Sequence, residues 1–416
     1  MKRIVLTLVL ILSSLATSLC PLVNAEENAS SFQASSQAAI AFQSQTGQVL
    51  YSKNTDQKLM AGSLTKLITA YMVYQAIEKE DVSWSTEVDI TDYPYYLTVN
   101  PNTTNVLLEK RKYTIDQLMD AMLVASSDSA AIALAERVGG TEKDFVDQMK
   151  KQLEEWGIKN ANLINASGLS NELLGENRYP GSKLTDANLL SAKDLALVSY
   201  HLLKDYPDVL KRTSKSSIKL DNKDYQTTNL FLANQVYFRE GVQGLAPAYS
   251  AKGGASLITY ASVNQTPIVT IVLNVDKSSS DPSLRYSSTN QLLTYIGQAY
   301  TPLTIVKKGE SYQNQTVTIQ DGAKDQLTPI AEEDFIYLQS SRKEEPEIYF
   351  SPLDQITPAP IKKAQNLATL TLKVDRKDYL TGQVPQVNLL ADQSLDKAIF
   401  FKVWWNQFVR YVNENL

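Results

Sequence analysis

Apolar positions between residues 36 and 300 follow two periods, one typical of strands and one typical of helices. Alternation over residues 36–53, with a turn at 45–47, predicts a β-hairpin. A helical spacing of apolar residues follows Ser63. Apolar runs at 256–260 and 268–275 predict two further strands. Strands at both ends with helices between them predict an α/β (α+β) unit whose terminal strands share one sheet.

Capping residues mark the helices between those strands. Thr114 with Gln117 is a capping box, and Thr141 and Ser191 stand before two more helical patterns. Another helix is expected over residues 130–138, closed by two glycines. It begins directly after a break at residues 126–128.

The pattern changes after residue 302. Short β-branched runs separated by turns predict a small all-β sandwich domain over residues 303–394. Residues 395–416 form an amphipathic pattern, with one face built from large aromatic side chains and the other from polar ones. This segment is too polar to span a bilayer and suits its interface. A helix docked on the β domain is the alternative.

The N-terminus predicts secretion. Lys2 and Arg3 precede an apolar stretch, and Val23-Asn24-Ala25 resembles a cleavage site, so residues 1–25 are predicted to be a signal peptide. A lipid anchor at Cys20 is the alternative, but bulky Leu19 precedes that cysteine. The expected location is the outer face of the cytoplasmic membrane, in the cell wall zone.

Composition narrows the chemistry. The chain has 416 residues, a formal net charge of -5 and a single cysteine, which lies in the predicted signal. A mature chain without cysteine has no disulfide and no thiolate metal site, and neither a metal nor another cofactor is expected. The absence of a basic run argues against nucleic acid as a partner.

Ser63 and Lys66 are the candidate reactive pair. Their spacing puts a hydroxyl and an amine on one helix face, a turn apart. A partly desolvated lysine can act as the base that makes a serine nucleophilic. Ser-x-x-Lys begins the catalytic set of penicillin-binding proteins and class A β-lactamases.

The order of the motifs along the chain resembles the low-molecular-mass penicillin-binding proteins, the serine D-alanyl-D-alanine carboxypeptidases of the streptococcal type. Gly62-Ser63-Leu64-Thr65-Lys66 and the runs 46–51, 128–136, 165–169 and 179–182 follow that family in order. The resemblance implies a β-lactamase/transpeptidase-like catalytic domain over residues 26–302, the β domain and the membrane-associating tail. It implies that the substrates are peptidoglycan stem peptides and that β-lactams bind if the site is catalytically active.

The resemblance assigns roles residue by residue. Ser63 is the expected nucleophile, Lys66 the general base and Ser126 the proton relay. The family's second motif, Ser-x-Asn, aligns with Ser126-Ser127-Asp128, so an aspartate replaces the asparagine. Its third motif, Lys-Thr-Gly, aligns without a gap with Ala246-Pro247-Ala248. The backbone N–H groups of Ser63 and Tyr249 are expected to form the oxyanion hole.

These departures predict weakened activity. The cation that holds a substrate carboxylate is lost at Ala246, and Asp128 is expected to add a negative charge facing the substrate. Pro247 is compatible with an edge strand only, and Ala248 adds a methyl group where substrate backbone would approach. Lys252 could replace the lost cation if the strand register were shifted.

Two hypotheses follow for function. One is a carboxypeptidase of reduced activity, acting through a Ser63 acyl-enzyme. The alternative is a catalytically inactive paralogue that binds cell wall or a protein partner. A β-lactamase is poorly supported, because the β domain and aromatic tail have no role in that reaction.

Overall fold

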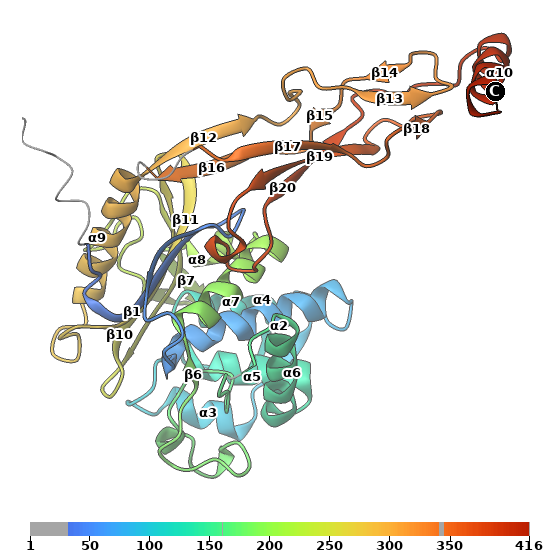
Figure 1. Cartoon of the computed structure of the whole chain (residues 1–416). Coiled ribbons are helices and arrows are strands. Elements are labelled where there is room, and N and C mark those ends of the chain that lie inside the picture. The colour runs from blue at the N-terminus through green and yellow to red at the C-terminus, as the bar shows by residue number, and fades with distance from the viewer. Residues whose placement is uncertain (1–31, 160, 341–344, 416) are drawn as a thin grey trace, which may run out of the picture. The chain divides into compact units, whose positions relative to one another are not determined.

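The computed structural model describes residues 32–159, 161–340 and 345–415, and the predicted signal peptide lies outside them. The central element is an antiparallel five-stranded sheet in the order β2-β1-β11-β10-β9 (Figure 1). Its strands are β1 (Ser36–Gln43), β2 (Val49–Lys53), β9 (Val242–Ser250), β10 (Gly254–Val263) and β11 (Thr266–Val275). β1 pairs with β11 through Ile40 opposite Ile271, which confirms that strands from the two ends of this unit share one sheet.

Helices lie on both faces of the sheet (Figure 1). They are α2 (Lys66–Glu78), α3 (Asp92–Thr98), α4 (Ile115–Leu123), α5 (Asp128–Gly139), α6 (Glu142–Glu155), α7 (Ala192–Asp205), α8 (Val209–Thr213) and α9 (Leu284–Ala299). The predicted caps are confirmed: Thr114 with Gln117 and Ser191 with Asp194 form capping boxes, and the Thr141 hydroxyl accepts from Asp144 N–H.

Short elements connect these units. They are β3 (Leu59–Met60), β4 (Glu87–Asp89), β5 (Lys112–Thr114), β6 (Leu189–Leu190), β7 (Ser217–Leu220), β8 (Lys223–Gln226) and the 3-10 turns η1 (Gly62–Thr65), η2 (Asn171–Leu173) and η3 (Gly175–Asn177). The helix predicted at Ser63 therefore begins with the 3-10 turn η1 and continues as α2 from Lys66.

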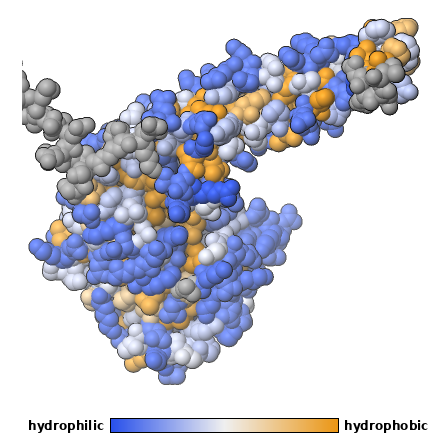
Figure 2. All heavy atoms as spheres, in the orientation of Figure 1, coloured by the Kyte–Doolittle hydropathy of each residue, from blue (hydrophilic) through white to orange (hydrophobic). Residues whose placement is uncertain are grey.

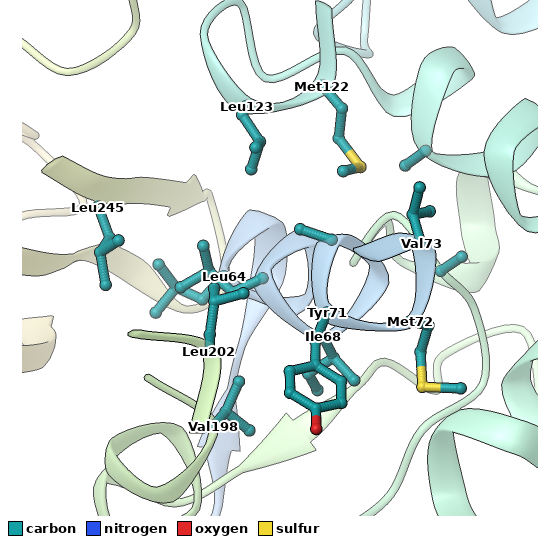
Figure 3. Close-up of a cluster of buried hydrophobic side chains, with 14 of the residues drawn as sticks. Leu64, Ile68, Tyr71, Met72, Val73, Met122, Leu123, Val198, Leu202 and Leu245 are labelled. Atoms are coloured by element: carbon teal, nitrogen blue, oxygen red, sulfur yellow. The ribbon is translucent and has the colours of Figure 1, made fainter. Parts of the chain in front are cut away.

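The core lies between α2 and the elements around it. Figure 3 shows Leu64 and Ile68 facing Val198 and Leu202 of α7, with Leu245 of β9 on the side of Leu64. Each fully buried leucine or isoleucine contributes about 1.5–3 kcal/mol to stability. Leu64 lies between Ser63 and Lys66, Leu67 directly follows Lys66, and both leucines are fully buried, so packing fixes the backbone that carries the Ser63 and Lys66 side chains.

The residues after α9 form an all-β domain with its own core, as predicted. Its strands are β12 (Tyr300–Val306), β13 (Val317–Gln320), β14 (Gln326–Leu327), β15 (Ile330–Ala331), β16 (Phe335–Ser340), β17 (Glu347–Pro352), β18 (Thr357–Pro358), β19 (Asn366–Lys373) and β20 (Gln386–Leu390), with the turn η4 (Arg376–Asp378). Sheets β14-β13-β18 and β15-β20-β19-β17 contribute to this core. The chain ends in α10 (Phe400–Asn415).

Candidate active site

The reactive pair predicted from the sequence is in contact. Lys66 Nζ donates to Ser63 Oγ at 3.1 Å. Ser63 is half-buried on η1, while Lys66, the first residue of α2, is 2% exposed. The Nζ–Oγ distance allows direct proton transfer between the two side chains once Lys66 is an amine.

The loop at residues 165–168 supplies a second contact to the lysine. Lys66 Nζ donates to the Ser167 carbonyl at 2.9 Å. Gly168, with φ of +87°, lets this loop approach η1, because a Cβ there would lie 1.8 Å from the Gly62 carbonyl oxygen. Asn165 Oδ1 accepts from Gly168 N–H at 2.6 Å and holds the turn.

The second motif lies at the start of α5. Ser127 is the N-cap, and its hydroxyl accepts from Ala130 N–H. Ser126 has a φ of 57°, a left-handed conformation that is strained for serine, and its side chain makes no hydrogen bond to another described residue. The expected proton relay, Ser126, therefore has no hydrogen bond to Ser63 or Lys66.

Asp128 is directly hydrogen-bonded to Lys66. Lys66 Nζ donates to its Oδ1 at 2.6 Å, and Thr104 N–H donates to its Oδ2 at 3.0 Å. Asp128 is only 2% exposed. Burial raises the pKa of Asp128, and the Lys66 charge and both hydrogen bonds oppose that shift. The structure thus differs from the expectation that this carboxylate faces the substrate, because its charge is paired inside the protein.

Residues 104 and 105 were not singled out from the sequence. Besides the Thr104 contact, Asn105 Oδ1 accepts from Ser129 N–H at 2.7 Å and from the Ser127 hydroxyl at 3.1 Å. These two residues position the second motif. They lie in an irregular segment more than 20 positions away in the chain, and no periodicity or motif in the sequence indicates their contact.

Residues 246–248, which the sequence aligns with the third motif, lie on a strand next to η1. This strand is β9, which is an edge strand, and proline, which lacks an N–H donor, is tolerated at such a position. Ala248 is 6% exposed, and a Cβ on Gly62 would lie 3.5 Å from its methyl group. The strand therefore runs beside η1, the turn that carries Ser63. Tyr249 is exposed on this strand, and its role in an oxyanion hole stays a prediction.

Two cations lie near this strand. Lys252 is in the turn between β9 and β10, where its ammonium pairs with Glu172 at 2.6 Å, and β9 keeps the register that places residues 246–248 beside η1. The shifted register that would bring Lys252 into the site is not present. Arg285, at the start of α9, donates to the Ala248 carbonyl at 2.7 Å. No motif in the sequence indicates Arg285, because it stands alone in a helical pattern 37 residues after Ala248.

The arrangement suits nucleophilic chemistry. A serine and a lysine in hydrogen-bond contact lie beside the edge strand β9, which can pair with an extended peptide. Among the described residues, no group of His, Cys, Asp and Glu could hold a metal ion.

Comparison with known proteins decides the family. Residues 24–277 match the family model described as D-alanyl-D-alanine carboxypeptidase. The chain belongs to this family. Residues 300–397 match the model of the penicillin-binding protein 5 C-terminal domain, so the resemblance extends through the β domain.

Individual relatives agree with the family match. A crystal structure of PBP3 from Streptococcus pneumoniae, described as a peptidoglycan synthesis regulatory factor, superposes with a TM-score of 0.83 at 37% identity, covering 88% of this chain and all of that one. Penicillin-binding protein 5 of Haemophilus influenzae shares the fold, with a TM-score of 0.65 at 21% identity, covering 88% of this chain and 99% of that one. The D-alanyl-D-alanine carboxypeptidase DacF of Bacillus subtilis is 25% identical over 81% of both chains.

The chain is therefore a D-Ala-D-Ala carboxypeptidase-like penicillin-binding protein, as its motifs predicted. The family acts on peptidoglycan stem peptides that end in D-Ala-D-Ala and binds β-lactams. These comparisons give the inactive-paralogue alternative no support over the carboxypeptidase.

Proposed function

We propose that Ser63 carries out serine-type D-Ala-D-Ala carboxypeptidase chemistry on peptidoglycan stem peptides, at a reduced rate. The observation that carries this proposal is the 3.1 Å contact between Lys66 Nζ and Ser63 Oγ in a member of this family. The substituted third motif is the reason for the reduced rate.

The reaction would proceed through an acyl-enzyme. Ser63 Oγ attacks the carbonyl carbon between the two D-alanines, and its proton passes to Lys66 in the amine form. The peptide C–N bond breaks, the leaving amine receives a proton through Ser126, and free D-alanine departs. Water then hydrolyses the Ser63 ester and regenerates the hydroxyl.

The altered motifs weaken both binding and activation. Ala246 cannot provide the ion pair that the family's lysine makes with a terminal carboxylate, which costs about 1.5–3 kcal/mol of transition-state binding. Arg285 is already bonded to the Ala248 carbonyl. In addition, Lys66 is paired with Asp128 rather than with a neutral amide. Together, these changes are expected to lower turnover by something on the order of a thousandfold.

Acylation by benzylpenicillin tests the nucleophile. The full-length chain, purified in detergent, is incubated with millimolar drug and its intact mass is measured. The expected result is a mass increase of one penicilloyl group, absent in Ser63→Ala. Release of D-alanine from a peptide ending in D-Ala-D-Ala gives the turnover. No adduct on a protein shown to be folded would overturn the proposal.

We further propose that α10 anchors the protein to the outer face of the cytoplasmic membrane. Its aromatic side chains are exposed, Phe400 and Phe401 by about three quarters and Trp404 and Trp405 by more than half. On the polar side, Lys402 pairs with Asp325 at 2.8 Å and Arg410 with Asp321 at 3.1 Å. Figure 2 shows hydrophobic residues among paler ones at this end of the chain. No helix among the described residues is long and apolar enough to cross a bilayer.

Vesicle flotation tests the tail. The full chain is mixed with vesicles of phosphatidylglycerol and phosphatidylethanolamine, and the bound fraction is measured. Trp404→Ser with Trp405→Ser is expected to reduce binding at least tenfold, because tryptophan supplies much of the apolar area at an interface. Lys402→Gln, which alters the polar side, is the matched control and should retain binding. Equal binding by both variants would exclude the aromatic face as the anchor.

A further inference from the structure

The Lys66 ammonium has three acceptors. They are Asp128 Oδ1 at 2.6 Å, the Ser167 carbonyl at 2.9 Å and Ser63 Oγ at 3.1 Å. A lysine ammonium has three N–H donors and no lone pair. Every donor is therefore used, and the serine oxygen accepts a hydrogen bond from the residue that would have to take its proton.

The contacts of Asp128 are those of a carboxylate. One oxygen accepts from Lys66 and the other from Thr104 N–H, at 3.0 Å. Both side chains of the ion pair are only 3% exposed, so water screens their attraction little. A buried charge pair whose members satisfy each other's hydrogen bonds is hard to separate.

The two other groups that are hydrogen-bonded to the ammonium, among the described residues, are uncharged. η1 contributes the Ser63 hydroxyl and the loop at 165–168 contributes the Ser167 carbonyl. A further acid in this network is Glu142 of α6. Its Oε1 accepts from the N–H of Ala166, the residue before Ser167. Burial raises the pKa of the Tyr93 hydroxyl of α3, and the charges of Glu142 and Asp128 add to that shift. Asp128 is thus the acid in direct contact with the lysine.

We propose that Asp128 holds Lys66 as an ammonium, which cannot accept the Ser63 proton, and so restrains the reactivity of Ser63 before any substrate binds. This inference rests on the proposed function and adds its regulation. Asp128 is a positioning residue here, because it acts on Ser63 through Lys66. The lost cation of the third motif acts separately, on the carboxylate of the substrate. The two effects can be separated by a reagent that has no carboxylate.

Phenylmethylsulfonyl fluoride is such a reagent. It is neutral, and its reaction forms a bond between Ser63 Oγ and sulfur, breaks the sulfur–fluorine bond and releases fluoride with the serine proton. The test measures the second-order rate constant of sulfonylation of the full chain from pH 6 to pH 10. Peptide mapping, with Ser63→Ala/Asp128→Asn as the blank, confirms the labelled residue.

Asp128→Asn keeps the shape of the side chain and an acceptor oxygen while removing the charge. We expect this variant to react at least tenfold faster than the wild type at pH 7, with the midpoint of its pH profile at least one unit lower. A merely structural role for Asp128 would not move the profile. Asp128→Ser, which also removes the charge, is the second variant if thermal unfolding shows that Asp128→Asn is not folded.

Two control variants show whether the shift in the pH profile comes from Asp128 in particular. Glu172→Gln removes the same charge from the acid that pairs with Lys252 and should leave the profile of the wild type unchanged. Glu142→Gln measures the contribution of the second acid in the network and should not reproduce the shift.

The proposal is overturned if the folded Asp128 variants react no faster than the wild type and share its profile, or if none reacts at any pH. Faster sulfonylation of Asp128→Asn, in a protein that benzylpenicillin does not acylate, would support the restraint. That combination of results would support the restraint by Asp128 while contradicting the proposed carboxypeptidase activity.

Discussion

The buried pair between Lys66 and Asp128 makes a quantitative prediction about stability. Lys66→Met keeps the length of the side chain but leaves the Asp128 carboxylate, 2% exposed, with only the Thr104 N–H as a partner. At the observed 2.6 Å, the gross attraction between the charges is about 6 kcal/mol for an effective dielectric constant near 20. Most of this offsets the cost of burying them, but removing one partner leaves that cost uncompensated. We therefore expect a loss of about 3–5 kcal/mol at pH 8.

The loss should depend on pH. In Lys66→Met, burial still raises the pKa of Asp128, and the opposing charge of Lys66 is gone. Below about pH 4 the carboxyl is protonated in both the folded and the unfolded state, so its burial costs little. As the pH rises, the unfolded state ionises first, and the variant loses stability relative to the wild type.

Thermal unfolding at pH 4.5 and pH 8 measures both effects. The expected decrease in Tm at pH 8 is roughly 6–10 °C, and the decrease at pH 4.5 should be smaller. Lys66→Met/Asp128→Asn, which removes both charges, should regain at least half of the loss. A decrease corresponding to less than about 1 kcal/mol at pH 8, or no recovery in the double variant, would refute the reasoning.

Three further predictions concern the loop, a buried acid and the third motif. Gly168→Ala places a Cβ against the Gly62 carbonyl and should lower the free energy of unfolding by roughly 3 kcal/mol or more. The control Gly157→Ala, at a similar φ but in open space, should lower it by only about 1 kcal/mol. Equal Tm values for the two variants would contradict this prediction. Burial raises the pKa of Glu142 to about 7, so Tm should fall as pH rises from about 4.5 to 7, and Glu142→Gln should remove that dependence. Restoring Lys-Thr-Gly at 246–248 in Asp128→Asn should raise D-alanine release at least a hundredfold over the parent; no increase would show that the motifs do not limit turnover.

Local patterns were enough to predict most of the elements. The capping boxes at Thr114 and Ser191 are determined by residues three positions apart, so they formed as expected. The hairpin formed from β1 and β2 and the edge position of Pro247 also follow from local rules of pairing and turn geometry. The spacing of Ser63 and Lys66 likewise placed the dyad correctly, because one helical turn separates them.

The partners of the dyad could not be predicted in this way. Thr104, Ser167 and Arg285 reach the site from segments far apart in the chain, and no period or motif links them. The sequence places an aspartate at position 128, but it does not show which way the charge of that side chain points. A carboxylate facing the cleft would repel an anionic substrate, whereas one buried at 2.6 Å from Lys66 acts on the base itself.

By itself, then, the amino-acid sequence determined the family, the order of the elements and the spacing of Ser63 and Lys66, since these depend on residue identity and short-range geometry. Tertiary structure decided that Asp128 pairs with Lys66, that Lys252 stays in a turn with Glu172, and that Ala248 lies beside η1. The physical reason is that burial and pairing decide what a charge does, and both are set by segments that meet only in the folded chain.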